Sequence, residues 1–162
     1  NLVQMIGLCE YTPNYGPIFI LSKYIAGITL ETHVKEQLNY LSPSDKLEKI
    51  TTEMCYVLDA LQYLHSRGVV HRDVKPSNIM IENGSVVKLM DLGIARLNGG
   101  NKYSSYGFIG TPQYAAPEQI LRDSENTERI SDFRGLYAAA YHLSGQRRGE
   151  YPAEKNGKTS VK

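Results

Sequence analysis

Tryptophan is absent from this chain, and only two cysteines occur, Cys9 and Cys55. Both lie in apolar or helical surroundings, which favours buried free thiols in a reducing compartment over a disulfide or a metal site. No apolar run approaches the roughly 20 residues that a membrane-spanning helix needs, and no signal peptide is visible. We therefore expect a cytoplasmic location and no membrane segment in this stretch.

An excess of charge of one sign is also missing. Lysine and arginine number 18 against 17 acidic residues, which leaves a net charge of +1. This balance gives no reason to expect nucleic acid or an anionic membrane as a partner. A chain of 162 residues can bury one real core and hardly two. Because it begins with Asn1 and not with methionine, we expect an excerpt of a longer protein.

The hydrophobic pattern predicts a mixture of strands and helices. Two strands are expected at 2–9 and 18–21, and a short helix at 30–38. A longer helix is expected to begin after Ser42, which is a good N-cap, and to end at Gly68. Its apolar stripe should face the core and consists of Leu47, Ile50, Met54, Val57, Leu58, Leu61 and Leu64.

The second half of the chain continues with a hairpin and a helix. Asn83-Gly84 predicts a tight turn between strands at 79–81 and 86–90. A long loop is expected at 98–110, a helix at 136–143, and a polar tail at 145–162 that frays.

One short loop combines a carboxylate, a cation and an amide. It is His71-Arg72-Asp73-Val74-Lys75-Pro76-Ser77-Asn78, in which Asn78 follows Asp73 after four intervening residues. Phosphoryl transfer needs little covalent help from the protein, so catalysis rests on placing the nucleophile and neutralising phosphate charge. This set of residue types meets most of that need.

Three further motifs follow this loop in a fixed order. They are Asp91-Leu92-Gly93, Gly110-Thr111-Pro112-Gln113-Tyr114 and Ala116-Pro117-Glu118. With the loop at 71–78 they resemble the eukaryotic-like protein kinase family, from about residue 2 to about residue 145. The resemblance implies a partial α+β, protein kinase-like fold. Residues 1–27 would be the end of the small β lobe and the hinge, 28–145 part of the mainly helical large lobe, and 146–162 a poorly matched tail.

The resemblance also implies roles for individual residues. Asp73 would accept or orient the proton of the substrate hydroxyl, and Lys75 would stabilise the charge of the transferred phosphate. Asn78 and Asp91 offer hard oxygen ligands that suit Mg²⁺ bound together with ATP phosphates. Thr111 would hydrogen-bond Asp73 and Lys75, as in the serine/threonine branch of the family. The alternatives are a salt-bridged loop aspartate for Asp73 and turn formers for Asn78 and Asp91.

The same resemblance predicts the residues of the adenine site. Backbone groups of Lys23 and Ile25 would bond the adenine edge, Met80 would form the apolar floor, and Ser22 would be the gatekeeper. His71 would be structural and pack against Leu92. Arg72 beside the catalytic Asp suggests control by phosphorylation of the following loop, with Tyr103, Ser104 and Ser105 as candidate acceptors, although a serine-rich loop is also simply soluble.

Parts of the family pattern are missing from the sequence. No Gly-x-Gly-x-x-Gly loop, no Val-Ala-Ile-Lys strand lysine and no partner glutamate for that lysine precede the hinge, so the fragment alone is expected to be inactive and to bind ATP weakly. Ser131-Asp132 and Gly135 resemble the family's central helix, but Tyr137 stands where Gly is usual and Arg134 replaces an aromatic. Asp132 is therefore either the anchor of the catalytic-loop backbone or, after a small deletion, an ordinary loop acid.

The sequence thus predicts a serine/threonine protein kinase that transfers the γ-phosphate of ATP to a protein substrate. One alternative is a pseudokinase or interaction domain; the retained Asp73, Lys75, Asn78 and Asp91 argue against it. The other is a small-molecule kinase of related fold. Thr111 and the segment 116–118 argue against that alternative because they resemble a platform for peptide substrates.

Overall fold

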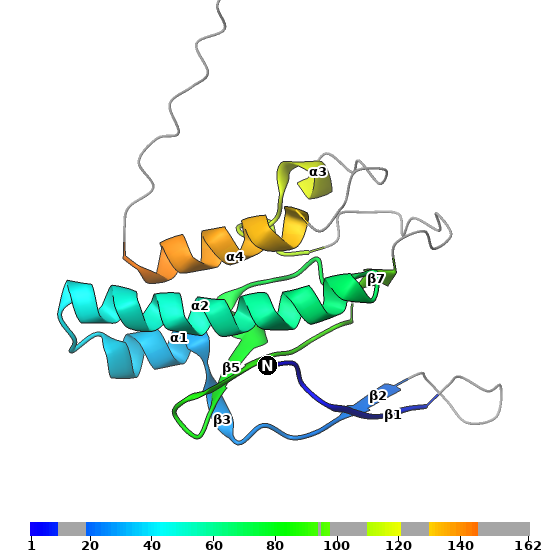
Figure 1. Ribbon diagram of the computed structural model, residues 1–162, viewed down its shortest axis with the longest axis horizontal. Helices are drawn as coiled ribbons and strands as arrows, with labels where there is room; N and C mark the ends of the chain where they lie inside the picture. Colours follow the sequence, from blue (N-terminus) through cyan, green and yellow to red (C-terminus); the bar gives the residue numbers. More distant parts are fainter. Residues whose placement is uncertain (10–18, 94, 98–109, 121–129, 146–162) are drawn as a thin grey trace, which may run out of the picture.

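The computed structural model describes residues 1–9, 19–93, 95–97, 110–120 and 130–145. Strands and helices are mixed, so the predicted α+β class is confirmed, with a small β part and a larger helical part (Figure 1). The loop expected at 98–110 and the tail expected at 145–162 fall almost wholly outside the described ranges.

The longest helix, α2 (Pro43–Ser66), begins and ends where the sequence predicts. The Ser42 hydroxyl accepts the N–H of Asp45 at 3.2 Å and donates to the Asp45 carboxylate at 2.8 Å. At the other end, Gly68 has φ of +72°, a conformation that glycine adopts without steric cost. Capping at both ends fixes the length of α2, and with it the position of the segment that follows.

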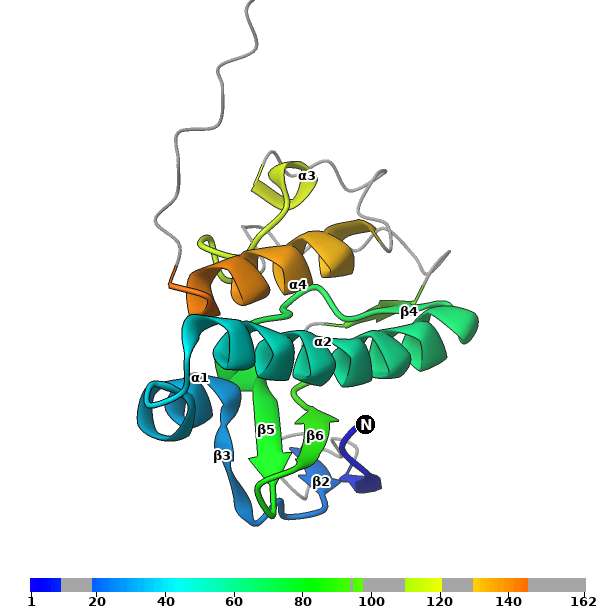
Figure 2. The same ribbon diagram turned by 60° about the vertical axis from the view of Figure 1, so that its left-hand side comes forward.

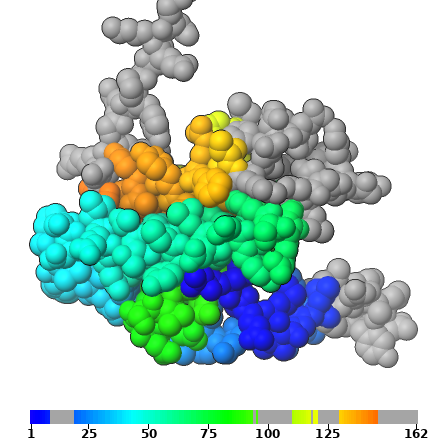
Figure 3. Space-filling model, in the orientation of Figure 1, coloured from blue at the N-terminus to red at the C-terminus, as the bar shows by residue number. Residues whose placement is uncertain are grey.

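Helix α2 lies between two other layers (Figures 1 and 2). Helix α4 (Ile130–Leu143) packs on one side, and strands β5 (Ile79–Glu82) and β6 (Val86–Leu89) lie on the other. A single apolar core joins the layers, and its buried members from α2 include Ile50, Met54, Val57, Leu61 and Leu64. The space-filling view shows α2 running across one face, between α4 and the strands (Figure 3).

Three expectations about α2 are wrong. The side chains of Leu47 and Leu58 are 51% and 39% exposed, so the apolar stripe is narrower than the sequence predicts. Cys55 carries an exposed thiol instead of a buried one. The three residues lie beside the stripe on the helix surface, where no described neighbouring element covers them. Cys9 lies at the edge of the described residues, and its side chain is not described.

Strands β3, β5 and β6 form a three-stranded antiparallel sheet in which β5 is the central strand. The sequence pattern does not predict β3 (Gly27–Thr29), which pairs with β5 so closely that a Cβ at Gly27 would clash with the Ile81 carbonyl oxygen. The predicted turn between β5 and β6 is confirmed, with positive φ at both Asn83 and Gly84. Burial alternates along β5, and Ile79 and Ile81 face the core.

The two strands expected at 2–9 and 18–21 are confirmed as β1 (Met5–Cys9) and β2 (Phe19–Ser22), which pair as an antiparallel ribbon. A parallel bridge between Leu2 and Leu89 joins the chain start to β6. Apolar side chains on both faces of the ribbon are more than half exposed: Met5, Ile6, Leu8, Phe19, Ile20 and Leu21. The described part of the chain therefore leaves both faces of this ribbon uncovered.

The helix expected at 30–38 is one α-helical turn, α1 (Leu30–His33), followed by a π-helix over Val34–Leu38. The Thr29 hydroxyl caps α1 by accepting the N–H of Thr32 at 3.2 Å. Helix α4 begins six residues before the predicted residue 136. A further pair of short strands, β4 (Val69–Val70) and β7 (Arg96–Leu97), frames the loop with the catalytic motif and was not predicted.

Two ionisable side chains face each other inside the core, where α1 meets α2. His33 Nε2 lies 3.0 Å from Glu53 Oε1, and both side chains are 4% exposed. Burial raises the pKa of Glu53, although the electrostatic interactions with His33 and Lys49 work against this rise. Among the described residues, neither His33 Nδ1 nor Glu53 Oε2 has a hydrogen-bond partner. The pair is therefore incompletely satisfied.

We expect Glu53→Leu alone to lower the free energy of unfolding by about 3–5 kcal/mol, because the buried imidazole of His33 loses the carboxylate that faces it. The double change His33→Leu with Glu53→Leu should be neutral or stabilising, since two apolar groups then fill the same volume. Urea unfolding of the wild type, both single variants and the double variant measures the coupling. A double variant less stable than either single one would contradict this account of the pair.

Candidate active site

The loop at 71–78 runs from β4 to β5 and is anchored by a buried carboxylate of α4. Asp132 is 1% exposed; its Oδ2 accepts the N–H of His71 at 2.9 Å, and its Oδ1 accepts the N–H of Arg72 at 2.7 Å. The ring of His65 lies 2.8 Å from the same carboxylate. Asp132 is thus the anchor of the catalytic-loop backbone, and the alternative of an ordinary loop acid is wrong.

Close packing between α4 and the loop explains one glycine. A Cβ at Gly135 would lie 2.9 Å from the carbonyl oxygen of Val74 and 3.1 Å from its Cβ. Any side chain there would push α4 and the loop apart. Tyr137, where the family has glycine, points outward instead: it is 63% exposed and stacks on Tyr141 at 6.3 Å. This departure from the family pattern therefore leaves the packing against the loop intact.

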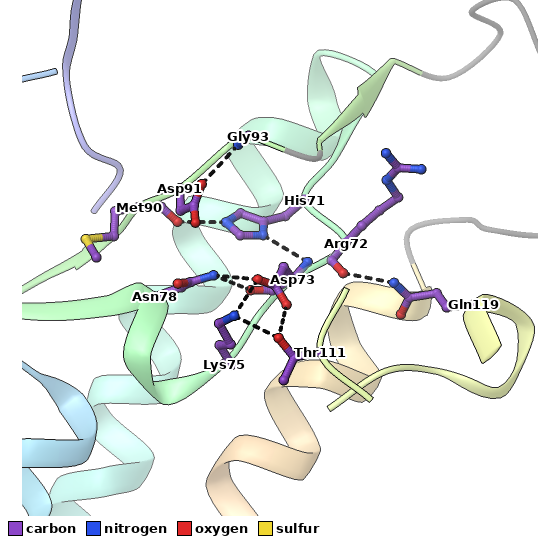
Figure 4. A network of polar contacts seen from close by, with 10 residues as sticks. All are labelled: His71, Arg72, Asp73, Lys75, Asn78, Met90, Asp91, Gly93, Thr111 and Gln119. Carbon is purple, nitrogen blue, oxygen red and sulfur yellow. Dashed lines mark hydrogen bonds and ion pairs between the residues drawn. The ribbon is translucent and has the colours of Figure 1, made fainter. Parts of the chain in front are cut away.

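Three polar side chains close a triangle at the centre of the loop (Figure 4). The Thr111 hydroxyl donates to Asp73 Oδ1 at 2.7 Å and accepts from Lys75 Nζ at 2.7 Å. Lys75 Nζ also lies 2.7 Å from Asp73 Oδ2. The predicted hydrogen bonds from Thr111 are confirmed. Asn78 completes the set, because its Nδ2 donates to Asp73 Oδ2 at 3.0 Å and to the Asp73 backbone carbonyl at 2.9 Å.

This environment keeps Asp73 ionised. Burial raises the pKa of its carboxyl group, but the hydrogen bonds from Lys75, Thr111 and Asn78 and the charge of Lys75 outweigh burial, so the pKa lies below its usual value. The Asp73 side chain is 10% exposed and that of Lys75 is 21% exposed. An ionised carboxylate is thus held next to a cation and a hydroxyl, which is what a proton acceptor or a hydroxyl-orienting group requires.

His71 is structural, as the sequence predicts. The residue is 0% exposed, its Nε2 donates to the Met90 carbonyl at 3.0 Å, and its Nδ1 accepts the N–H of Asp73 at 3.3 Å. A carbonyl can only accept and an amide can only donate, so these two partners select the tautomer protonated at Nε2. The ring thereby ties the loop to the segment that precedes Asp91.

Asn78 and Asp91, the predicted metal ligands, lie on either side of the β5–β6 hairpin. The N–H of Met90 donates to the Asn78 carbonyl at 3.0 Å, which brings the two segments together. Because the Asn78 nitrogen faces Asp73, its side-chain oxygen points away from it (Figure 4). Asp91 is exposed and has φ of +67°, a left-handed conformation that is uncommon outside glycine. Two such oxygens suit Mg²⁺ that completes its ligand shell with phosphate and water.

A metal site made by protein side chains alone does not fit this region. The described residues contain no cluster of three or more histidine, cysteine, aspartate or glutamate side chains able to hold a metal ion. Asn78 and Asp91 therefore remain predicted ligands for a cation that arrives with phosphate groups.

The residues predicted for the adenine site lie in β5 and in the segment between β2 and β3. Met80 is half-buried on the face of β5 opposite Ile79 and Ile81, and it pairs with Thr29 of β3. Ile25 is half-buried two residues before β3. The N–H of Lys23 donates to the Gln4 carbonyl at 2.8 Å, so this N–H extends the pairing of the β1–β2 ribbon.

Other predicted residues fall outside the description. The candidate phosphate acceptors Tyr103, Ser104 and Ser105 lie outside the described residues. The prediction that Arg72 senses a phosphate there therefore stays a prediction. Two further residues that hold the loop, His65 and Gln119, are not predicted from the sequence. His65 contacts the Asp132 carboxylate and Gln119 contacts the Arg72 carbonyl, and no local sequence pattern indicates contacts with such distant groups.

Comparison with known families agrees with this geometry. Residues 1–155 match the model of the protein kinase domain. The chain belongs to the protein kinase family. It is 38% identical over 136 residues to the serine/threonine-protein kinase PknB of Mycolicibacterium smegmatis, which covers 82% of this chain and 20% of that protein.

Other bacterial relatives give a similar result. A probable serine/threonine-protein kinase PknB of Bifidobacterium longum is 39% identical over 128 residues, covering 77% of this chain and 18% of that protein. The serine/threonine-protein kinase PknB of Mycobacterium leprae is 34% identical over 146 residues, with coverages of 88% and 22%. The chain thus spans about one fifth of the length of the curated relatives it matches. Within the described residues, no helix has the length and apolar character to cross a membrane.

Proposed function

We propose that this chain carries the catalytic centre of a serine/threonine protein kinase, which transfers the γ-phosphate of ATP to a hydroxyl of a protein substrate. The observation that carries the proposal is the triangle of Asp73, Lys75 and Thr111, with its three contacts of 2.7 Å. The names of the relatives support the same activity and give no support to a pseudokinase.

The chemistry assigns one task to each member of the triangle. Asp73 takes the proton of the substrate hydroxyl while the hydroxyl oxygen forms a bond to the γ-phosphorus and the bond to the bridging oxygen breaks, so that ADP leaves. Lys75 lies beside the transferred group and offsets its developing negative charge. Thr111 fixes the direction of both side chains from the segment that would face the peptide.

Nucleotide and metal would occupy the adjoining residues. ATP would supply the phosphoryl group, and Asn78 and Asp91 would hold Mg²⁺, whose charge would offset that of the phosphates. The Lys23 carbonyl and the Ile25 N–H would bond the adenine edge above Met80. We place the end of the small β lobe and the hinge at 1–27, since the uncovered apolar faces of the β1–β2 ribbon suit a strand pair within a larger sheet. Because the reaction consumes ATP, we propose a cytoplasmic location.

The proposed activity is tested with the full-length protein that carries this chain, incubated with γ-labelled ATP and casein as a serine- and threonine-containing acceptor. Label should enter casein when Mg²⁺ is present and should fall to background when EDTA removes the metal. Absence of incorporation under both conditions would overturn the proposed function. Incorporation that EDTA leaves unchanged would overturn the assignment of Asn78 and Asp91 as metal ligands.

The hydrogen bond from Thr111 predicts a pH effect. Thr111 stabilises the ionised form of Asp73, so Thr111→Val should raise the pKa of Asp73. Because activity requires the ionised carboxylate, it should be lost at a higher pH in the variant than in the wild type when the pH is lowered. The acidic limb of the kcat/KM profile measures this. Thr51→Val, at an exposed position of α2, is the control, and an identical acidic limb in all three proteins would contradict the assignment.

A further inference from the structure

Arg72 has a backbone conformation that needs support. Its φ is +69°, in the left-handed region where a residue with a Cβ is strained. Such conformations persist at functional sites when the surrounding structure holds them in place. Since Arg72 directly precedes Asp73, its conformation sets the direction in which the catalytic carboxylate leaves the main chain.

One side of Arg72 is held by the buried anchor already described. Its N–H donates to Asp132 Oδ1 at 2.7 Å. The other side is held by the side chain of Gln119. Nε2 of Gln119, in the short helix α3 (Pro117–Ile120), donates to the Arg72 carbonyl at 2.9 Å (Figure 4).

The second end of the Gln119 amide is also occupied. Its Oε1 accepts the N–H of Ala116 at 2.9 Å, and the residue is 7% exposed. A carbonyl accepts and an N–H donates, so only one orientation of the amide satisfies both partners. Gln119 therefore joins the strained loop residue to the start of the Ala116-Pro117-Glu118 segment through two aligned hydrogen bonds.

Because the peptide bond is planar, the hydrogen bond to the Arg72 carbonyl also restricts the backbone of Asp73. The Arg72 carbonyl and the Asp73 N–H belong to one rigid peptide unit. Gln119 holds the carbonyl end of that unit, and the ring of His71 accepts the N–H end at 3.3 Å. The orientation of the unit is thus fixed at both ends, and Asp73 starts from a defined direction toward Thr111 and Lys75.

We propose that Gln119 is a positioning residue for phosphoryl transfer, acting through the Arg72–Asp73 peptide unit. The assignment rests on the proposed kinase function. It gives the segment at 110–120 a second link to the catalytic loop: Thr111 contacts the reacting side chains, and Gln119 contacts the backbone from which Asp73 projects. A displacement of Ala116 would move the Gln119 amide, and with it the Arg72 carbonyl and the backbone of Asp73.

The test uses Gln119→Met in the full-length protein, because methionine keeps the length of the side chain and removes both hydrogen bonds. We expect kcat to fall by about 10- to 100-fold, the scale of a displaced catalytic group, with KM for ATP changed by less than about twofold. Gln62→Met, at an exposed position of α2, is the matched control and should leave both constants unchanged. Wild-type kinetics in Gln119→Met would overturn the proposal.

A second variant separates positioning from a loss of folding. In Gln119→Glu the ionised carboxylate repels the Arg72 carbonyl, whereas the protonated form can donate to it. The ratio of variant to wild-type kcat should therefore rise as pH falls. A ratio that does not change with pH would count against the proposed hydrogen bond.

Hydrogen exchange makes the outcome independent of activity. Amide exchange over residues 71–75 should be faster in Gln119→Met than in the wild type and in Gln62→Met. If exchange is faster in Gln119→Met but the wild-type protein transfers no phosphate, the proposed kinase function is wrong, whereas the structural contact between Gln119 and Arg72 is supported. If the wild-type protein is active and Gln119→Met changes neither the exchange rate nor kcat, the positioning role of Gln119 is wrong and the proposed kinase function is not affected.

Discussion

Asp73→Asn should reduce phosphate transfer by about 100- to 10,000-fold, the range that positioned proton acceptors contribute. The amide cannot take a proton from the substrate hydroxyl. Its NH₂ group would also face Lys75 Nζ, 2.7 Å from the present carboxylate, or the Thr111 hydroxyl, which now donates to Asp73. Transfer of labelled phosphate from ATP to casein by the full-length protein measures the loss.

The matched control for this change is Asp59→Asn. Asp59 is an exposed residue of α2 and undergoes the same chemical substitution. It should retain wild-type transfer, which excludes a general effect of converting an aspartate to an amide. Equal transfer by Asp73→Asn and the wild type would contradict the role given to Asp73. A loss of the same size in Asp59→Asn would show that the assay reports something other than the site.

Asp132→Ala should lower the free energy of unfolding by about 3–5 kcal/mol, because three buried groups lose their shared acceptor. These are the N–H groups of His71 and Arg72 and the ring of His65. Arg72 would also lose half of the support for its left-handed conformation. Urea unfolding measures the loss, and transfer activity should fall with it, since the loop that carries Asp73 is released.

Asp59→Ala is the control for this second substitution. The exposed side chain should be replaceable within about 0.5 kcal/mol. If Asp132→Ala kept both the urea midpoint and the transfer activity of Asp59→Ala, the carboxylate would not be the anchor of the catalytic loop. A variant that stayed stable but lost activity would place its effect on the loop geometry and not on the fold.

Much of the site could be predicted because its residues lie close together in the sequence and have distinctive side chains. Asp73, Lys75 and Asn78 fall within one loop, and Thr111 follows in a recognisable segment. The sequence does not decide the role of Asp132, because Tyr137 and Arg134 depart from the family pattern nearby. The structure shows why these departures are tolerated: both side chains are exposed, whereas the face of α4 that meets the loop is kept.

Other features depend on contacts that a local pattern cannot contain. Gln119 is recognised only when α3 is placed against Arg72, which is 47 residues away in the chain. The short strands β4 and β7 exist through pairing with each other and have no periodicity of their own. Similarly, Leu47, Leu58 and Cys55 fit a helical pattern, but whether they are covered depends on which elements pack beside α2.

The acceptor residue in the product tests the central claim most directly. Casein labelled by the full-length protein is hydrolysed, and its phosphorylated amino acids are separated. The arrangement of Lys75 and Thr111 around Asp73 predicts phosphoserine or phosphothreonine with the wild type and only background label with Asp73→Asn. Phosphotyrosine as the main product, or no labelled amino acid at all from the wild type, would contradict the account.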